Sequence, residues 1–359
     1  MLKLKWIRGH ETLRFDRPDV WFSLGMRGTG KSSFLEHIGM EYYKQKAVIL
    51  DLFGSRDGEG LAWLRSDLVK NENAKVLLLK DENVDVTSSF DVKLAKALTL
   101  KDVEAHDIIV SSAPFYLNFD REFLSAALVT DLLYKRLHFT RLVYLICREA
   151  SNFYYSRLKV SENQTFAKAQ MVYLLRESRH MGLALGIDSL RFYSLDIDIR
   201  NLTDYLALKS QGAQGLTKDL KWLYNYVDAG LMRDMKPEQF VMLTKRGSIG
   251  YGVFSEIGWH KKEKEDIMNL LGLKVEYGEV LEEPILKGTY KTVGDVEHSE
   301  IMRIRVEEKL GMIQIGERQK RSSRTIKVHI GSHNQEVRRN GFCAACKRVG
   351  NNYYNRIIE

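Results

Sequence analysis

The sequence predicts an α/β protein with a mainly parallel, doubly wound sheet, followed by a small C-terminal helical domain. Three observations support this prediction. Short apolar runs alternate with amphipathic stretches, a glycine-rich loop joins one apolar run to the next helix, and the last sixth of the chain is strongly basic. Parallel strands that helices cover on both faces read as continuous apolar runs, as these runs do.

The expected elements follow one another along the chain. Short apolar runs predict strands, and apolar positions at helical spacing predict helices. The expected strands are residues 19–25, 47–50, 75–79, 107–110, 142–147, 183–187 and 205–209. The expected helices are residues 31–44, 119–138 and 164–180.

Three parts are expected. Residues 1–257 form the α/β domain, because the alternation continues to that point. Residues 258–290 hold a charged helix over 259–271 and then a linker, since Gly, Pro and acidic residues follow there without periodicity. Residues 291–359 form a basic module.

Composition excludes several classes of protein. Of the 359 residues, 44% are hydrophobic and 28% charged, which excludes a fibrous or wholly disordered chain. No run of about 18 apolar residues occurs, so no membrane span is expected. Charges near the start argue against a signal peptide. Three cysteines cannot form a disulfide scaffold, and we expect a cytoplasmic protein.

The positive charge is concentrated at one end. The formal net charge is +8, and residues 301–359 alone hold 13 basic against 5 acidic residues, so the first 300 residues balance. A basic end on a neutral body favours contact with a polyanion, most often nucleic acid. The alternative is a solvated basic tail.

The glycine-rich loop matches the phosphate-binding pattern G-x4-G-K-[ST] between an expected strand and an expected helix. Glycines let backbone N–H groups curl around phosphate oxygens, and the helix N-terminus adds positive partial charge. Lys31 is expected to reach the β- and γ-phosphates, and the Ser32 hydroxyl to ligate Mg²⁺. The candidate residues for binding ATP are Gly25, Gly28, Thr29, Gly30, Lys31, Ser32 and Ser33.

Four further blocks follow in order. They are Asp51-Leu-Phe-Gly54, Arg148-Glu-Ala-Ser-Asn-Phe153, Leu175-Arg-Glu-Ser-Arg-His-Met-Gly182 and Asp188-Ser-Leu-Arg191. With the phosphate loop, they resemble the HerA/FtsK superfamily of DNA-pumping ATPases over roughly residues 15–257. The resemblance implies a RecA-like P-loop ATPase fold, ATP with Mg²⁺, double-stranded DNA as partner and homo-oligomeric rings, often hexamers.

The resemblance also implies roles for individual residues. It places Asp51 at the nucleotide and Glu149 as the base that orients the attacking water. Two positions depart from the pattern, since Arg148 replaces the Mg²⁺-associated Asp and Leu190 replaces the sensor Gln. We expect Arg148 to oppose a bound metal ion. Asp188 is a candidate for the missing carboxylate, and the alternative is a helix or turn cap.

An arginine from a neighbouring subunit completes the site in such rings. The candidates are Arg179, Arg191 and Arg200, with Arg200 ranked first. Each of them is otherwise a surface or salt-bridging arginine. Cys147 is expected to be a buried apolar residue.

Residues 313–330 resemble the second and third helices of helix-turn-helix regulators. The match covers Ile315, Gly316, Glu317, Arg318, Ser322, Arg324, Thr325, Ile326, His329 and Ile330. Ser322 is expected to cap the third helix, and Ile326 and Ile330 to bury its inner face. The residues expected to meet the major groove of DNA are Ser323, Arg324 and Lys327. The alternative is an ordinary pair of basic amphipathic helices.

A candidate zinc site lies in the same module. His329 and His333 are four residues apart, and Cys343 and Cys346 follow. Two imidazoles and two thiolates make a tetrahedral set suited to Zn²⁺. The alternative is two unrelated histidines and a free pair of thiols.

These observations predict an ATP-driven DNA translocase or genome-packaging motor that docks DNA through its C-terminal helices. A compact motor of this kind suits a virus or a plasmid. The rival is an ATP-binding, DNA-attached switch or scaffold with weak or no hydrolysis, which Arg148 and Leu190 favour. A motor for protein or single-stranded DNA also stays open.

Overall fold

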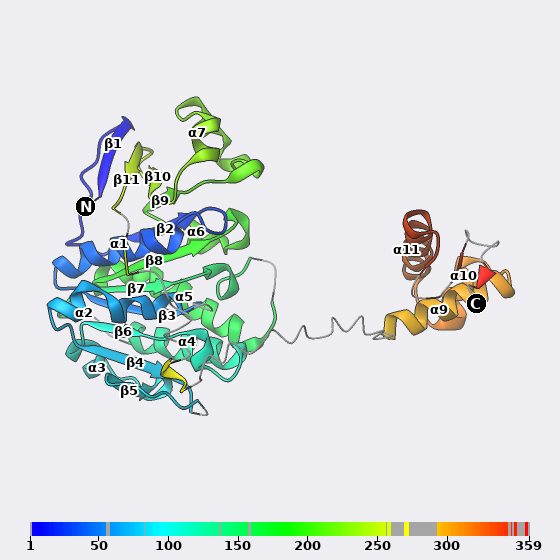
Figure 1. Ribbon diagram of the computed structural model, residues 1–359, viewed down its shortest axis with the longest axis horizontal. Helices are drawn as coiled ribbons and strands as arrows, with labels where there is room; N and C mark the ends of the chain where they lie inside the picture. The colour runs from blue at the N-terminus through cyan, green and yellow to red at the C-terminus, as the bar shows by residue number, and fades with distance from the viewer. Residues whose placement is uncertain are drawn as a thin grey trace. The chain divides into compact units, whose positions relative to one another are not determined.

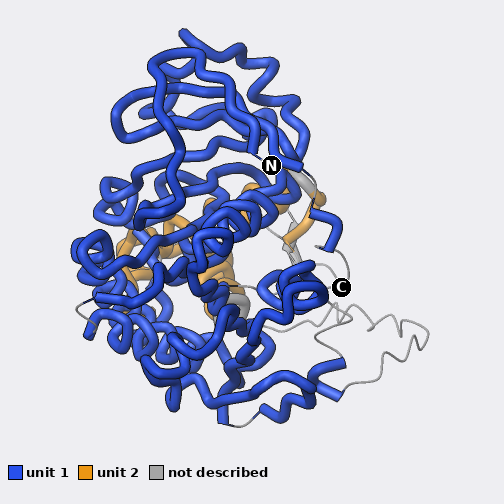
Figure 2. Tube along the Cα trace, turned by 90° about the vertical axis from the view of Figure 1, so that its left-hand side faces the viewer, with its two compact units in different colours: residues 1–275 blue, residues 276–359 orange. Residues whose placement is uncertain are grey.

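The computed structural model describes most of the chain. The described residues are 2–54, 58–82, 84–135, 138–156, 159–255, 257–259, 269–272, 293–343, 346, 348–349 and 356–357. The chain divides into two compact units, residues 1–275 and 276–359, coloured blue and orange in Figure 2. The helix expected over 259–271 lies mostly outside the described residues, and the linker expected over 274–290 lies entirely outside them.

The first unit is built on one sheet of eleven strands in the order β1-β11-β10-β9-β2-β8-β7-β3-β6-β4-β5 (Figure 1). The strands are β1 Lys3–Arg8, β2 Val20–Leu24, β3 Val48–Phe53, β4 Val76–Lys80, β5 Asp91–Leu94, β6 Ile108–Val110, β7 Val143–Cys147, β8 Leu183–Ser189, β9 Tyr205–Leu208, β10 Gln239–Thr244 and β11 Ile249–Val253. Strands β2 to β9 pair in parallel. The prediction of a mainly parallel α/β sheet is therefore confirmed.

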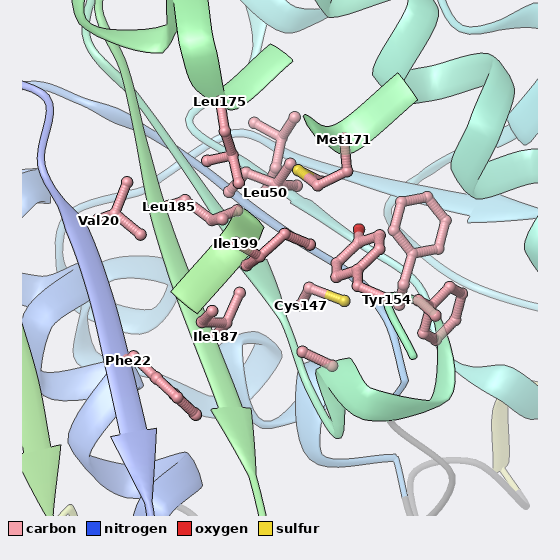
Figure 3. Packing of buried hydrophobic residues seen from close by; sticks show 14 of the residues in the cluster. Val20, Phe22, Leu50, Cys147, Tyr154, Met171, Leu175, Leu185, Ile187 and Ile199 are labelled. Atoms are coloured by element: carbon pink, nitrogen blue, oxygen red, sulfur yellow. The ribbon is translucent and has the colours of Figure 1, made fainter. Parts of the chain in front are cut away.

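Helices cover both faces of this sheet. The α-helices of the first unit are α1 Lys31–Lys44, α2 Asp67–Asn71, α3 Leu100–Ala105, α4 Phe119–Tyr134, α5 Glu162–Met181, α6 Ile197–Asn201 and α7 Ala229–Asp234. Alternation along β2 explains the two layers, since Val20 and Phe22 join the core beneath α4 and α5, while Trp21 joins the core beneath α1. In Figure 3, Met171 and Leu175 of α5 lie over buried residues of the sheet.

The site depends on the shared direction of the central strands. Because β2, β3, β7 and β8 are parallel, their carboxyl ends lie at one edge of the sheet. The phosphate loop follows β2, Gly54 follows β3, Arg148 and Glu149 follow β7, and Leu190 follows β8. The topology therefore brings the phosphate loop and three of the four further blocks to one edge, whereas the block Leu175–Gly182 at the end of α5 precedes β8.

An antiparallel extension was not predicted. Strands β10 and β11 form a hairpin, and β1 pairs with β11 at the sheet edge. The hairpin follows Pro237, whose carbonyl oxygen lies 2.3 Å from where a Cβ on Gly30 would stand. Only glycine fits at that point of the phosphate loop, whose backbone φ is also positive (79°).

The described residues of the second unit form three helices: α9 Val293–Glu307, α10 Met312–Gln319 and α11 Ser323–Asn340. Two short strands, β12 Arg348–Val349 and β13 Arg356–Ile357, pair antiparallel. Its core consists of Ile301, Met302, Ile304, Ile315, Ile326 and Ile330. Throughout the described part of both units, no helix is both long enough and apolar enough to cross a membrane.

Candidate functional sites

The phosphate loop presents an open helix N-terminus. Helix α1 begins at Lys31 after Gly30, has no side-chain cap and has no acidic residue in its first turn. Its first N–H groups are therefore left for an anion, which the helix dipole also favours. The Thr29 hydroxyl donates to the Met26 carbonyl oxygen at 2.8 Å and closes the loop on itself.

The loop opens into a cleft of about 640 Å³. Lys31 is 6% exposed, and its Nζ donates to the Met26 carbonyl oxygen at 3.1 Å. The Ser32 hydroxyl donates to Glu59 Oε2 at 2.9 Å. The lining residues are Arg27, Gly28, Gly30, Lys31, Ser32, Ser33, Gly54, Glu59, Glu149, Asn152, Leu190 and Pro237. Two cationic side chains, two hydroxyls and two carboxylates therefore share one cleft.

Several sequence-predicted residues lie outside the lining. These are Gly25, Thr29, Asp51, Asp188 and Arg200. Gly25 has a packing role, since a Cβ there would stand 2.6 Å from Lys209 Cβ.

Arg148 is fully buried among three carboxylates. Its Nε and Nη2 donate to Asp51 at 3.0 and 2.5 Å, and Nη2 also donates to Glu36 Oε1 at 2.7 Å. Its Nη1 lies 3.6 Å from Glu59 Oε2. Burial by itself lowers the Arg148 pKa, but the charges of Asp51, Glu36 and Glu59 outweigh it and raise that pKa well above its ordinary value.

This arrangement bears on two expectations. The Arg148 guanidinium is enclosed by three acidic partners, Asp51, Glu36 and Glu59. The Asp51 carboxylate lies outside the cleft lining and accepts hydrogen bonds from Trp63 Nε1 at 2.8 Å and from Arg148. Both residues form a buried ion pair beneath the cleft.

Glu149 follows Arg148 in a left-handed conformation, with φ of 45°. Its backbone N–H donates to Asp188 Oδ1 at 2.5 Å. Asp188 is 1% exposed, and burial raises its pKa to about 7, against the charge of Lys31. In this structure Asp188 therefore holds the turn that carries Glu149, which is the capping alternative weighed from the sequence.

Sequence reasoning missed Glu59, the residue that joins the cleft to the buried arginine. It begins the short 3-10 helix Glu59–Arg65. An acid in a glycine-rich loop after a parallel strand was the available signal. Gly54 belongs to the same loop, and it must be glycine because φ is 81° and a Cβ would stand 1.7 Å from the Arg148 carbonyl oxygen.

The three candidate trans-acting arginines have different surroundings. Arg179 pairs with Asp204, and Arg191 is exposed on a second cleft that shares Asn152 and Leu190 with the first. Arg200 is half-buried, with its guanidinium 4.8 Å from the Phe192 ring centroid. Within the described part of the chain, Arg200 Nε has no hydrogen-bond partner.

The second unit places its predicted residues as follows. Ser322 caps α11 by accepting from the Thr325 N–H at 3.2 Å, and Ile326 is fully buried, as expected. The three residues of α11 that are expected to meet DNA, Ser323, Arg324 and Lys327, are all exposed. A Cβ on Gly316 would stand 2.7 Å from the Arg321 carbonyl oxygen, so glycine permits the close turn between α10 and α11.

The histidines and cysteines do not meet as the sequence predicted. His298, on α9, joins His333, Cys343 and Cys346 with all ligand atoms within 4.8 Å of one another. His329 is not part of this group, although its ring centroid lies 5.7 Å from that of His298. Cys147 is fully buried in the first unit (Figure 3), and burial raises its pKa.

Comparison with known proteins gives matches to solved structures alone. No family model matches the chain, and no curated protein matches it. The genome packaging NTPase B204 of Sulfolobus turreted icosahedral virus 2 is 16% identical over 67% of this chain and 98% of its own, with a TM-score of 0.39.

Two further structures match. The pCW3 conjugation coupling protein TcpA is 14% identical over 74% of this chain and 70% of its own, with a TM-score of 0.38. The Thermomonospora curvata type VII secretion ATPase EccC is 12% identical over 68% of this chain and 38% of its own, with a TM-score of 0.39 in a structure of its ATPases 2 and 3. Identities and TM-scores this low say nothing about activity, which has to be argued from the cleft itself.

Proposed function

We propose that the first unit hydrolyses ATP with Mg²⁺ and that this hydrolysis moves double-stranded DNA. The observation that carries the proposal is the uncapped N-terminus of α1, which opens into a cleft holding Lys31, Ser32 and two carboxylates. Backbone N–H groups and a lysine suit a triphosphate, and carboxylates suit a metal ion and an attacking water.

Ser32 and Glu59 are the proposed holders of Mg²⁺. Magnesium prefers hard oxygen ligands, and these two side chains already lie 2.9 Å apart in the cleft. When bound, the ion neutralises charge on the phosphate groups. Glu59 thereby takes the part that the sequence assigned to Asp188, whose carboxylate is occupied with the backbone of Glu149.

Glu149 is the proposed base for the attacking water. It lines the cleft, and its backbone is held by Asp188 at the end of the neighbouring strand β8. A carboxylate held in place can accept a proton from water as bonding to the γ-phosphate develops. Lys31, the first residue of α1 after the phosphate loop, is the proposed contact to the phosphates.

We further propose a homo-oligomeric ring, with a hexamer as the first size to test. Arg200 is the proposed group from the neighbouring subunit, since its Nε has no hydrogen-bond partner among the described residues. The guanidinium charge would pair with the charge on the transferring phosphoryl group. Arg191 on the adjoining cleft is the alternative within the same subunit.

The second unit is the proposed DNA contact. Its α10 and α11 are joined by a tight turn at Lys320, and α11 exposes Ser323, Arg324 and Lys327 in its first turns. A helix presented in this way fits the major groove in the manner of a helix-turn-helix. The concentration of basic residues after position 300 supports the same proposal.

Steady-state ATP hydrolysis by the full chain, with and without linear double-stranded DNA, tests the motor. We expect Mg²⁺-dependent turnover that DNA stimulates. Lys31→Ala should abolish ATP binding or turnover, whereas Lys44→Ala, an exposed change on the same helix, should not. Bound ATP without turnover would instead support the switch or scaffold, and an unaffected Lys31→Ala would contradict the phosphate-loop assignment.

DNA affinity measured across salt concentrations tests the second unit. Arg324→Ala and Lys327→Ala should each weaken binding and lower its salt dependence, because each removes a positive charge from the helix proposed to enter the major groove. The matched control is Arg303→Ala, whose guanidinium is engaged with Glu300 and Glu307 on α9. Equal affinity and slope in all three variants would remove the DNA-reading role of α11.

A further inference from the structure

Two histidines and two cysteines converge inside the second unit. His298 comes from α9, His333 from α11, and Cys343 and Cys346 from the segment after α11. Cys343 Sγ lies 3.4 Å from His298 Nε2, and Cys346 Sγ lies 3.3 Å from His333 Nδ1. His333 and Cys343 are fully buried, and His298 is 6% exposed.

These distances are close to those of a tetrahedral zinc site. With Zn–S near 2.3 Å and Zn–N near 2.0 Å, a sulfur and a nitrogen on one ion stand about 3.6 Å apart. Two imidazoles with two thiols are a donor set that zinc takes in structural sites, where four protein ligands leave no open position. The cluster therefore matches a structural site in both composition and spacing.

The end of α11 explains how the cysteines return to the helix. Gly341 terminates α11 with a positive φ of 79°, and its N–H donates to the Val337 carbonyl oxygen at 2.9 Å. The chain then reverses, so that Cys343 Sγ donates to Glu336 Oε2 at 3.1 Å on the preceding turn. Metal binding would release this thiol proton, because zinc binds the thiolate.

We propose that His298, His333, Cys343 and Cys346 bind one Zn²⁺ that joins α9 to the end of α11. His298 thus takes the place that helical periodicity assigns to His329. The ion would stabilise a unit whose described part has a small apolar core of six buried residues, and small domains commonly rely on a metal or a disulfide. The site is independent of the nucleotide chemistry of the first unit.

Zinc content of the purified full chain tests the proposal. We expect one zinc per chain in the parent protein and loss of that zinc in His298→Ala, His333→Ala and Cys343→Ser. The matched control is His329→Ala, which removes the neighbouring histidine of the same region and should keep the zinc. A parent protein without zinc, or loss in His329→Ala but not in His298→Ala, would overturn the assignment.

A second variant separates ligand loss from unfolding. His298→Cys replaces one zinc ligand by another and should retain the metal. Substituted with Co²⁺, the parent should show the absorption of tetrahedral cobalt with thiolate charge transfer, and His298→Cys should intensify that band. An unchanged cobalt spectrum in His298→Cys would exclude residue 298 from the metal. Lys31→Ala should keep its zinc, so failure of the ATPase proposal leaves this result intact.

Discussion

In the first unit, carboxylates from three different segments enclose a fully buried arginine. In the second unit, two histidines and two cysteines converge, and none of these four side chains carries a fixed positive charge. Arg148 has Asp51, Glu36 and Glu59 as partners. The cluster around His298 consists of two imidazoles and two thiols, and the Glu336 carboxylate accepts from one of these thiols. Both are buried polar centres, and they differ in where the positive charge comes from.

Size accounts for the difference. A buried charge is costly unless it is paired and hydrogen-bonded, so the elements around it must be held firmly. The eleven-stranded sheet of the first unit has an extensive apolar core on each face to hold them. The core cluster in the described part of the second unit has six buried apolar residues, and a metal ion would both pair its ligands and hold its helices.

The largest expected effect is on turnover in the cleft of the first unit. Glu149→Gln should keep ATP bound and reduce hydrolysis about 10²–10⁴-fold, since it removes the base for water. Glu59→Gln should chiefly raise the Mg²⁺ concentration needed for turnover. The matched control, Glu162→Gln on α5, changes an exposed acid and should have no effect. Parent turnover in Glu149→Gln would remove Glu149 from the chemistry.

The next effect concerns the buried arginine. Arg148→Ala should lower the free energy of unfolding by about 3–5 kcal/mol, because it leaves Asp51 and Glu36 buried without their partner. Denaturant titration measures the free energy of unfolding of Arg148→Ala and of a control, Arg233→Ala. The control removes an exposed ion pair and should leave the unfolding midpoint unchanged. If the two units are independent, zinc content should be the same in both variants. A stable Arg148→Ala protein would contradict the ion-pair account.

The smallest effect is a pH dependence. The Asp188 pKa is raised from 3.8 to about 7 in the folded protein, so between these values the folded chain keeps a proton that the unfolded chain has lost. The contribution of Asp188 to the free energy of unfolding is greatest below pH 3.8. It is lost as pH rises through 7, and the total loss is at most about 4 kcal/mol. Asp188→Asn should therefore gain stability relative to the parent between pH 5 and 8.

Comparing Asp188→Asn with the parent at each pH cancels the pH-dependent contributions of the other titratable groups to stability. Burial lowers the His37 pKa to about 4 and the Lys209 pKa to about 7, and both remain in the variant. Denaturant titrations at pH 5, 6, 7 and 8 would show the relative gain as a slope. A constant difference between variant and parent would mean that Asp188 ionises normally.

Much of the first unit was predictable from the sequence. The helix expected over 31–44 is found with those bounds, and the parallel strands at the phosphate loop are present, because each signal lies within a few neighbouring residues. The β10–β11 hairpin was missed, although two apolar runs flank Lys245-Arg-Gly-Ser. The alternation of strands and helices is expected to continue to residue 257, and that expectation does not distinguish an antiparallel hairpin from further parallel strands.

The site was predictable only in part, because sequence signals act over a few neighbouring residues and the site joins distant ones. Lys31, Ser32 and Glu149 line the cleft as expected, because motif and strand order place them at one sheet edge. Glu59 was missed because no spacing rule connects it with Ser32. The pairing depends on where Glu59 lies relative to the first turn of α1 in the folded chain.

The sequence by itself determined the phosphate loop, the helix that follows it, the cap of α11 and the basic character of the C-terminal end. These features depend on backbone conformation and on contacts a few residues apart. Tertiary structure decided the partners of Arg148, which lie 97 and 112 positions away, and brought His298 to Cys343 across 45 positions. Burial makes such distant contacts strong, but strand order and helix packing choose which side chains meet, and no local pattern in the chain encodes that choice.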